Sequence, residues 1–421
     1  NDQLTESEYD SLFSVDKLLQ RPFMTALGNH ESHAEGVIFK YHYNFPNLSD
    51  KYGVGTASSD YWFRYGQTLF MVLKTNELDP KPHDEFMKET TAANPDVKWK
   101  ILIFHQSIYS SGSAHSTEKV IADLRNGMYP AIDKYGIDLV LSGHDHAYTR
   151  TYQMYGGKPL KEQTFDSQGR CVDPKGTLYI TGDSASLSKY YDLAETEEAY
   201  AAVRLQPEVP TFLQIQVSPM SLSIADYRAD TMERLDSYSI FKSFADVPQS
   251  AWYSNAVNFV AEKSIAGGTG NNMFSPDASI TRGQFIVMLM KACGISPDNS
   301  SGDNFSDAGN TYYTAYLAAA KRKGISGGIG DNLFAPESSI TRQDMVTLFY
   351  STLSKINKLP TGKNQIDLGS FKDAGSISSY AQVPMQTLLN AGLINGSGSE
   401  LQPQGGSTRA QMAQMIFKML S

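Results

Sequence analysis

The pattern of hydrophobic and polar positions changes near residue 244. Before it, short apolar runs end in polar residues: PFMTAL precedes Gly28, WKILIF precedes His105, and IDLVLS precedes Gly143. Such runs predict buried β-strands, and the amphipathic stretch 120–136 between two of them predicts a helix. Strands alternating with helices indicate α/β layering in this half of the chain.

After residue 244 one pattern occurs three times, beginning FADVPQ, FSDAGN and FKDAGS and ending ITRGQ, ITRQD and STRAQ. In each copy an Asp precedes an Arg by 36, 35 and 36 residues, which indicates one supersecondary unit used three times. Each copy predicts a helix, a Gly-rich turn and a second helix that begins at a capping Thr. The three pairs are Asp246 and Arg282, Asp307 and Arg342, and Asp373 and Arg409.

The first copy carries the clearest helix signals. The apolar face of its first helix is predicted by four residues at helical spacing: Trp252, Ala256, Phe259 and Val260. Thr281 is followed three residues later by Gln284, which is the pattern of a capping box at the start of the second helix.

The amino-acid composition argues against several classes of function. The 421 residues include 36 Lys and Arg against 45 Asp and Glu, a net charge of −9, whereas nucleic-acid binders usually carry a basic surplus. No apolar run approaches the ~20 residues that span a bilayer. Two cysteines cannot form a disulfide framework. Nucleic-acid binding as a main role and a transmembrane segment are therefore not expected.

Candidate chemistry is concentrated before residue 147, because all eight histidines lie between His30 and His146. In α/β sheets, ligands bind beyond the carboxyl ends of strands, where these polar clusters are expected. Imidazole nitrogens and an amide oxygen suit zinc, iron or manganese, and the set at the three run ends is Asn29, His105, His144 and His146. Taken singly, a histidine after a strand is equally explained by packing or capping.

The repeated Thr-Arg pair has two possible explanations. An Arg at the first helical position meets the positive end of the helix dipole, which disfavours it by a few tenths of a kcal/mol. Three such arginines therefore indicate partners that offset this cost. The partner is either an Asp, such as Asp246, Asp307 or Asp373, or an anionic ligand at the helix N-terminus.

The combination of GNHE, His105 and GHDHAYTR resembles the calcineurin-like metallophosphoesterases, and most of all their purple acid phosphatase branch. This resemblance covers residues 1–243 and implies a β-sandwich flanked by helices that hydrolyses phosphate esters through a hydroxide bridging two metal ions (Fe, Zn or Mn). It implies that Asn29, His105 and His144 ligate one metal and His146 the other. It also places His30 beside the scissile phosphate and His115 facing the substrate.

Two family motifs, Asp-x-His and GDxxD, precede GNHE in that family and do not occur in this sequence. We therefore expect the phosphoesterase domain to be incomplete at its N-terminal side, and the chain as given to bind metal poorly and turn over slowly. A competing hypothesis is a wall-binding structural protein with a degenerate, inactive phosphoesterase domain. A third is a nucleotidase or phosphodiesterase of the same fold.

The three copies resemble S-layer homology (SLH) repeats, at residues 244–297, 303–356 and 369–421. The resemblance implies an all-α, pseudo-threefold module that binds pyruvylated secondary cell-wall polysaccharide. Together the two resemblances predict an extracellular phosphoesterase associated with the cell wall or S-layer. The residues that the resemblance assigns to polymer binding are Asp246, Trp252, Arg282, Asp307, Arg342, Asp373 and Arg409.

Overall fold

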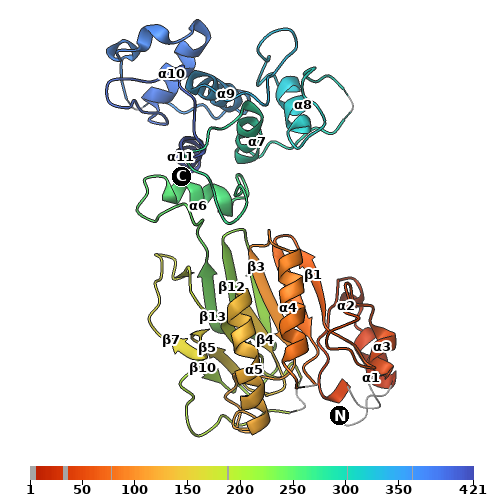
Figure 1. The fold of residues 1–421 in the computed structure, drawn as a ribbon. Coiled ribbons are helices and arrows are strands. Elements are labelled where there is room, and N and C mark those ends of the chain that lie inside the picture. The colour runs from red at the N-terminus through yellow and green to blue at the C-terminus, as the bar shows by residue number, and fades with distance from the viewer. Residues whose placement is uncertain (1–5, 32–36, 77, 187–188, 301, 363) are drawn as a thin grey trace. The chain divides into compact units, whose positions relative to one another are not determined.

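The computed structural model describes residues 6–31, 37–76, 78–186, 189–300, 302–362 and 364–421. The chain forms two compact units, Asn1–Lys242 and Ser243–Ser421 (Figure 1). In the described part of the chain, no helix is both long and apolar enough to cross a membrane.

A seven-stranded sheet forms the centre of the first unit. Strands β2, β3, β4 and β9 run parallel to one another, and β1, β5 and β10 are antiparallel to their neighbours. In spatial order the strands are β1 (Tyr61–Tyr65), β2 (Thr68–Leu73), β3 (Trp99–Phe104), β4 (Leu139–Ser142), β9 (Leu178–Thr181), β5 (Tyr148–Thr151) and β10 (Ala201–Leu205).

Two of the three predicted strands are confirmed, since WKILIF forms β3 and IDLVLS ends in β4. The strand predicted at PFMTAL is wrong, because these described residues form none. Phe23 and Met24 are exposed, so this run is not buried as a central strand would be. The carbonyl of Thr25 accepts a hydrogen bond from the Tyr61 hydroxyl (2.7 Å), a side-chain donor.

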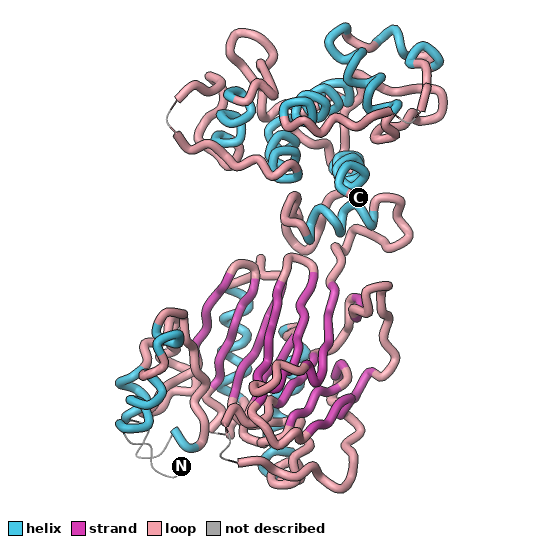
Figure 2. The backbone as a smooth tube through the Cα atoms, turned by 180° about the vertical axis from the view of Figure 1, so that it is seen from behind, coloured by secondary structure: helices cyan, strands magenta, loops and turns pink. Residues whose placement is uncertain are grey.

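A second sheet packs on one face of the first. It contains β11 (Thr211–Val217), β12 (Ser221–Arg228), β13 (Arg234–Phe241) and β8 (Cys171–Val172), and a separate hairpin joins β6 (Gln153–Tyr155) to β7 (Lys158–Leu160). Leu222 and Ile224 of β12 alternate with outward residues and pack against Trp99 and Leu139 of the first sheet. Figure 2 shows the strands from this side.

Helices cover the other face of the central sheet (Figure 1). Phe86 and Met87 of α4 (Lys81–Ala93) and Leu124 and Met128 of α5 (Lys119–Tyr135) are buried against it. Three short helices lie near the start of the unit: α1 (Glu6–Phe13), α2 (Asp16–Leu19) and α3 (Val37–His42). The predicted mixed α/β fold is confirmed, with two sheets and helices in separate layers.

Each repeat in the second unit contributes two α-helices. The first and second helices are α6 (Ser254–Glu262) and α7 (Arg282–Ala292), α8 (Thr314–Arg322) and α9 (Arg342–Lys355), and α10 (Ser379–Asn390) and α11 (Arg409–Leu420). Two 3-10 turns, η2 (Leu368–Ser370) and η3 (Ala374–Ser376), precede α10.

Every second helix begins at the Arg of its Thr-Arg pair. Thr281 forms the predicted capping box, and Thr408 forms a second complete one. Thr341 accepts only from the backbone N–H of Asp344 (3.3 Å). The carboxylate of Asp344 does not close the box, because it accepts from Arg282 (2.9 Å) and from the Tyr380 hydroxyl (2.7 Å).

The segments before these helices connect the three repeats in a closed ring. The backbone N–H of Ile280 donates to Ser407, that of Ser407 to Ile340, and that of Ile340 to Ile280, at 3.0, 3.1 and 3.0 Å. The N–H at the start of each second helix also donates to a carbonyl of the next repeat: Arg282 to Ser338, Arg342 to Gly405, and Arg409 to Ala278. Binding of an anionic ligand at the helix N-terminus requires free N–H groups. These three N–H groups already donate to the protein, so they are not available to such a ligand.

Candidate functional site

Three of the predicted metal ligands meet at one atom, Nε2 of His105. His105 follows β3 and His144 follows β4, so the parallel strands bring both to one edge of the sheet. Nε2 of His105 lies 2.6 Å from Oδ1 of Asn29 and 3.0 Å from Nδ1 of His144. An amide oxygen and two imidazole nitrogens thus converge from three loops.

The remaining predicted histidines lie around this group. The ring of His115 stacks on that of His144 with 4.3 Å between centroids, and Nδ1 of His115 lies 3.0 Å from Glu118. Tyr191 contacts the rings of both His115 (5.6 Å) and His146 (4.9 Å). The imidazole of His30 acts electrostatically on His105 and His144.

Burial, reinforced by the neighbouring imidazoles, lowers the pKa of His105 to about 3 and that of His144 to about 4. Both rings are therefore neutral at physiological pH, which is the form that binds metals. Two neutral imidazoles and an amide oxygen fit one borderline cation such as zinc.

The donor set fits a second cation less well. His146 Nδ1 lies 3.0 Å from the carbonyl of Lys189. The nearby carboxylate of Asp145 is buried and accepts from Ser110. Within the described residues, no group of three or more His, Cys, Asp or Glu side chains is arranged to hold a metal ion.

Two backbone features shape the loops that carry the ligands. His144 has φ +68°, a left-handed conformation that is uncommon for residues other than Gly and is often stored at functional sites. Gly28 lies against His105, because a Cβ there would approach the ring to 3.1 Å and Glu31 to 2.3 Å.

Sequence reasoning missed three residues around the cluster. Asp145 ties the His144–His146 turn to Ser110, Glu118 holds His115, and Tyr191 links two histidines. Asp145 could have been predicted from its place between two candidate ligands in the GHDH motif. Nothing in the sequence indicated Tyr191, because it reaches the cluster from a loop far along the chain.

In the second unit, the three repeated aspartates hold a turn. The carboxylate of Asp246 accepts from the N–H groups of Phe274 (2.8 Å) and Ser275 (2.7 Å). Asp307 and Asp373 make the equivalent bonds in their repeats. In each repeat the second donor has a left-handed backbone, with φ +57° at Ser275, +57° at Ala335 and +53° at Gln402. Holding these turns therefore accounts for the three carboxylates.

The three arginines donate hydrogen bonds to groups within the second unit. Arg282 is 6% exposed, and besides its bond to Asp344 its Nε donates to the carbonyl of Phe334 (2.8 Å). Arg409 is 5% exposed and donates to the carbonyls of Phe274 and Gly267, both at 2.8 Å. The expected arginine–aspartate bridge thus occurs once, with a different aspartate.

Arg342 and Trp252 have more capacity for a ligand. Arg342 donates from Nη2 to Asn395 (2.7 Å), but its buried Nε has no hydrogen-bond partner among the described residues. Trp252 precedes α6 and is 64% exposed, so its predicted place on the buried face of that helix is wrong. Ala256 and Val260 are fully buried, as predicted.

Comparisons with known families agree with this division of the chain. Residues 5–148 match the family model described as calcineurin-like phosphoesterase. The S-layer homology domain model matches residues 243–286, 304–346 and 370–413. The chain therefore contains one region that matches the calcineurin-like phosphoesterases and three that match the S-layer homology domain, and the resemblance to these two families is confirmed.

Two similar proteins each align with less than half of this chain. The S-layer protein sap of Bacillus anthracis is 29% identical over 177 residues, 42% of this chain and 21% of its own length. An endoglucanase of Bacillus sp. (strain KSM-635) is 32% identical over 205 residues, 48% of this chain and 21% of its own length. The chain thus spans about a fifth of the length of these relatives.

Among solved structures, a purple acid phosphatase from yellow lupin (Lupinus luteus) seeds aligns with 51% of this chain and 37% of its own, at 19% identity and a TM-score of 0.40. The three S-layer homology domains indicate association with the cell wall or S-layer.

Proposed function

We propose that this chain is a wall-anchored, metal-dependent phosphoesterase that acts on phosphate monoesters. The observation that supports it is the convergence of Asn29 and His144 on Nε2 of His105, with both imidazoles kept neutral by burial. Asn29, His105 and His144 would hold one ion and His146 would contribute to a second. Bound ions would activate water and neutralise the phosphate charge.

The other histidines would handle substrate and protons. Glu118 lies 3.0 Å from Nδ1 of His115 and would orient that ring. The His115 imidazole would supply a proton to the leaving oxygen of the ester. His30, beside the ligand cluster, would bind the phosphate. These roles leave His105 and His144 as ligands that do not exchange protons.

The test measures metal binding and phosphate release in the full chain. We expect His105→Ala to weaken Zn²⁺ or Mn²⁺ binding by roughly 100-fold or more, since removal of a supporting residue alone costs about 10- to 100-fold. Turnover should favour p-nitrophenyl phosphate over its bis-ester, and should be small in this chain. His42→Ala removes an imidazole on α3 and is the control. Equal metal affinity of His105→Ala and wild type would refute the site.

For the second unit, we propose binding of an anionic, pyruvylated secondary cell-wall polysaccharide. The support is the Nε of Arg342, which has no hydrogen-bond partner in the described part of the chain, and the exposed ring of Trp252. Asp246, Asp307 and Asp373, with Arg282 and Arg409, would shape the binding surface by holding the turns. Arg342→Ala should reduce co-sedimentation with purified cell walls without changing the melting temperature. Arg322→Ala, an exposed arginine on α8, should bind as wild type.

A further inference from the structure

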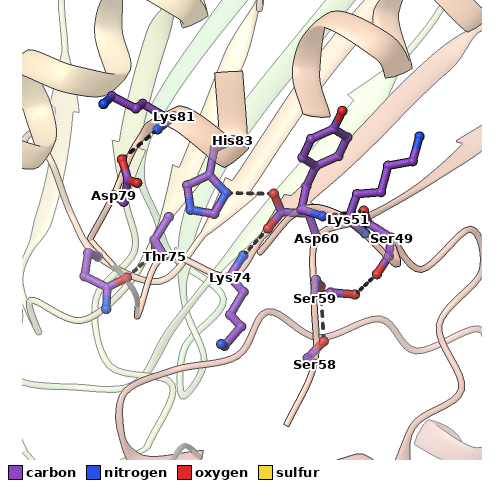
Figure 3. A network of polar contacts seen from close by, with 12 residues as sticks. Ser49, Lys51, Ser58, Ser59, Asp60, Lys74, Thr75, Asp79, Lys81 and His83 are labelled. Atoms are coloured by element: carbon purple, nitrogen blue, oxygen red, sulfur yellow. Dashed lines mark hydrogen bonds and ion pairs between the residues drawn. The ribbon is translucent and has the colours of Figure 1, made fainter. Parts of the chain in front are cut away.

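A buried carboxylate–histidine contact lies within a network of polar contacts in the first unit (Figure 3). Asp60, just before β1, places Oδ2 2.7 Å from Nδ1 of His83 on α4, and both side chains are almost fully buried. Oδ1 of the same carboxylate accepts from the backbone N–H of Lys74 (2.9 Å). One carboxylate thus joins β1, α4 and the end of β2.

Beyond Lys74, a line of side-chain hydrogen bonds runs to the ligand loops. The Thr75 hydroxyl donates to Oε1 of Gln106, and Nε2 of Gln106 donates to Oδ1 of Asn76 (2.9 Å). Nδ2 of Asn76 donates to the carbonyl of Gly28 (2.7 Å). Gln106 follows His105 and Gly28 precedes Asn29, so this line joins the neighbours of two candidate ligands.

The direction of every bond in this line is determined. A backbone carbonyl can only accept, so the amide group of Asn76 must turn its NH₂ to Gly28 and its oxygen to Gln106. Gln106 must then present NH₂ to Asn76 and its oxygen to the Thr75 hydroxyl. Thr75 and Gln106 are buried, so water does not readily replace a lost partner.

Gly28 leaves little freedom for the loop. Its N–H donates to Glu31 (2.9 Å), its carbonyl accepts from Asn76, and its Cα lies against the His105 ring. A shift of the Gly28 peptide therefore moves Asn29 relative to Nε2 of His105. Functional constellations tolerate only about 0.5 Å of such displacement.

We propose that Asn76 and Gln106 are positioning residues that hold Asn29 in place relative to His105. The buried Asp60–His83 pair anchors the backbone of Lys74, two residues before Asn76. This inference rests on the proposed function in that Asn29 and His105 are metal ligands there. The positioning itself is a property of the metal-free chain and can be measured without metal.

The critical variant is Asn76→Asp in the full chain. It keeps the size of the side chain but turns a carboxylate oxygen toward the Gly28 carbonyl, where repulsion replaces the bond. Asn47→Asp is the matched control, because Nδ2 of Asn47 also donates to a backbone carbonyl, that of Trp62 (3.0 Å), at an exposed position. Thr75→Val removes only the outer donor, and Thr75→Ser retains it.

Two measurements distinguish the outcomes. In the metal-free chain labelled with ¹⁵N-histidine, Asn76→Asp should shift the His105 imidazole signals, while Asn47→Asp and Thr75→Ser should not. With Co²⁺ as the probe, Asn76→Asp should weaken binding by about 10- to 100-fold and alter the visible absorption spectrum, with a smaller effect for Thr75→Val.

Unchanged His105 signals in both Asn76→Asp and Thr75→Val would overturn the positioning role. Shifted signals in a chain whose wild type does not bind Co²⁺ would support positioning and instead refute the metal site. Should Asn76→Asp fail to fold, the comparison of Thr75→Val with Thr75→Ser decides the same question.

Discussion

In the first unit, His105 faces Asn29 and the uncharged ring of His144, whereas in the second unit Arg282 and Arg409 donate to carbonyls of neighbouring repeats. The two imidazoles are partly buried and the two guanidinium groups are buried, and both sets come from motifs that suggested ligand binding. The imidazoles contact one another at a sheet edge, while the guanidinium groups connect the repeats. A repeated motif can therefore serve to join the repeats to one another. Polar side chains from different loops that meet only in the folded chain are the stronger indication of a functional site.

The largest effect in this comparison is expected from the buried arginines. Arg409→Ala should lower the free energy of unfolding by about 2–3 kcal/mol, because the buried carbonyl of Phe274 and the partly buried contact to the carbonyl of Gly267 lose a charged donor. Arg322→Ala should cost less than about 1 kcal/mol, since its pair with Asp298 is partly exposed. Urea unfolding of the full chain measures both. Equal costs would contradict the structural role assigned to Arg409.

Carboxylates in the two units should respond to pH in opposite directions. Burial, with a smaller contribution from the charges of Asp183 and Asp236, raises the pKa of Asp226 on β12 to about 7. Burial also tends to raise the pKa of Asp373, but the N–H groups of Leu401 and Gln402 outweigh it and lower the pKa.

The folded state therefore holds the Asp226 proton more tightly than the unfolded chain, and its stability falls as pH rises from about 4 to 7. Asp226→Asn should remove this decline and stabilise the chain by roughly 1–3 kcal/mol at pH 8, with little change at pH 4. Calorimetry across this pH range measures it. A variant less stable than wild type at pH 8 would contradict the assignment.

Asp373 contributes stability above its unfolded pKa of about 4, and loses it as pH falls through the lower folded value. Asp373→Asn should therefore destabilise the chain by about 1–2 kcal/mol at pH 7 and approach wild type in acid. The same calorimetric series measures this change. Stabilisation at pH 7 would show that the carboxylate does not hold the turn.

The smallest effect is expected at the helix caps. Thr281→Ala should cost about 1 kcal/mol, because the N–H of Gln284 loses its acceptor, whereas Thr281→Ser keeps the bond and should be nearly neutral. Urea unfolding distinguishes them. A cost well above this range would indicate that Thr281 does more than cap α7.

Local sequence was sufficient for much of the architecture. WKILIF and IDLVLS became strands because continuous apolar runs are stable only when both faces are covered. The starts of α7 and α11 followed from Thr281 and Thr408, since a capping box involves residues only three positions apart. PFMTAL misled the prediction because apolar composition does not show whether a neighbouring strand is available for pairing.

The sequence by itself determined which residue types are present and where helices and repeats begin, because these depend on neighbours along the chain. The tertiary structure alone decided that Asn29 meets His105, that Asn76 joins their two loops, and that Arg282 binds Asp344 of the next repeat. Such contacts depend on how loops from distant segments pack, and their energies are set by burial, which no local pattern records.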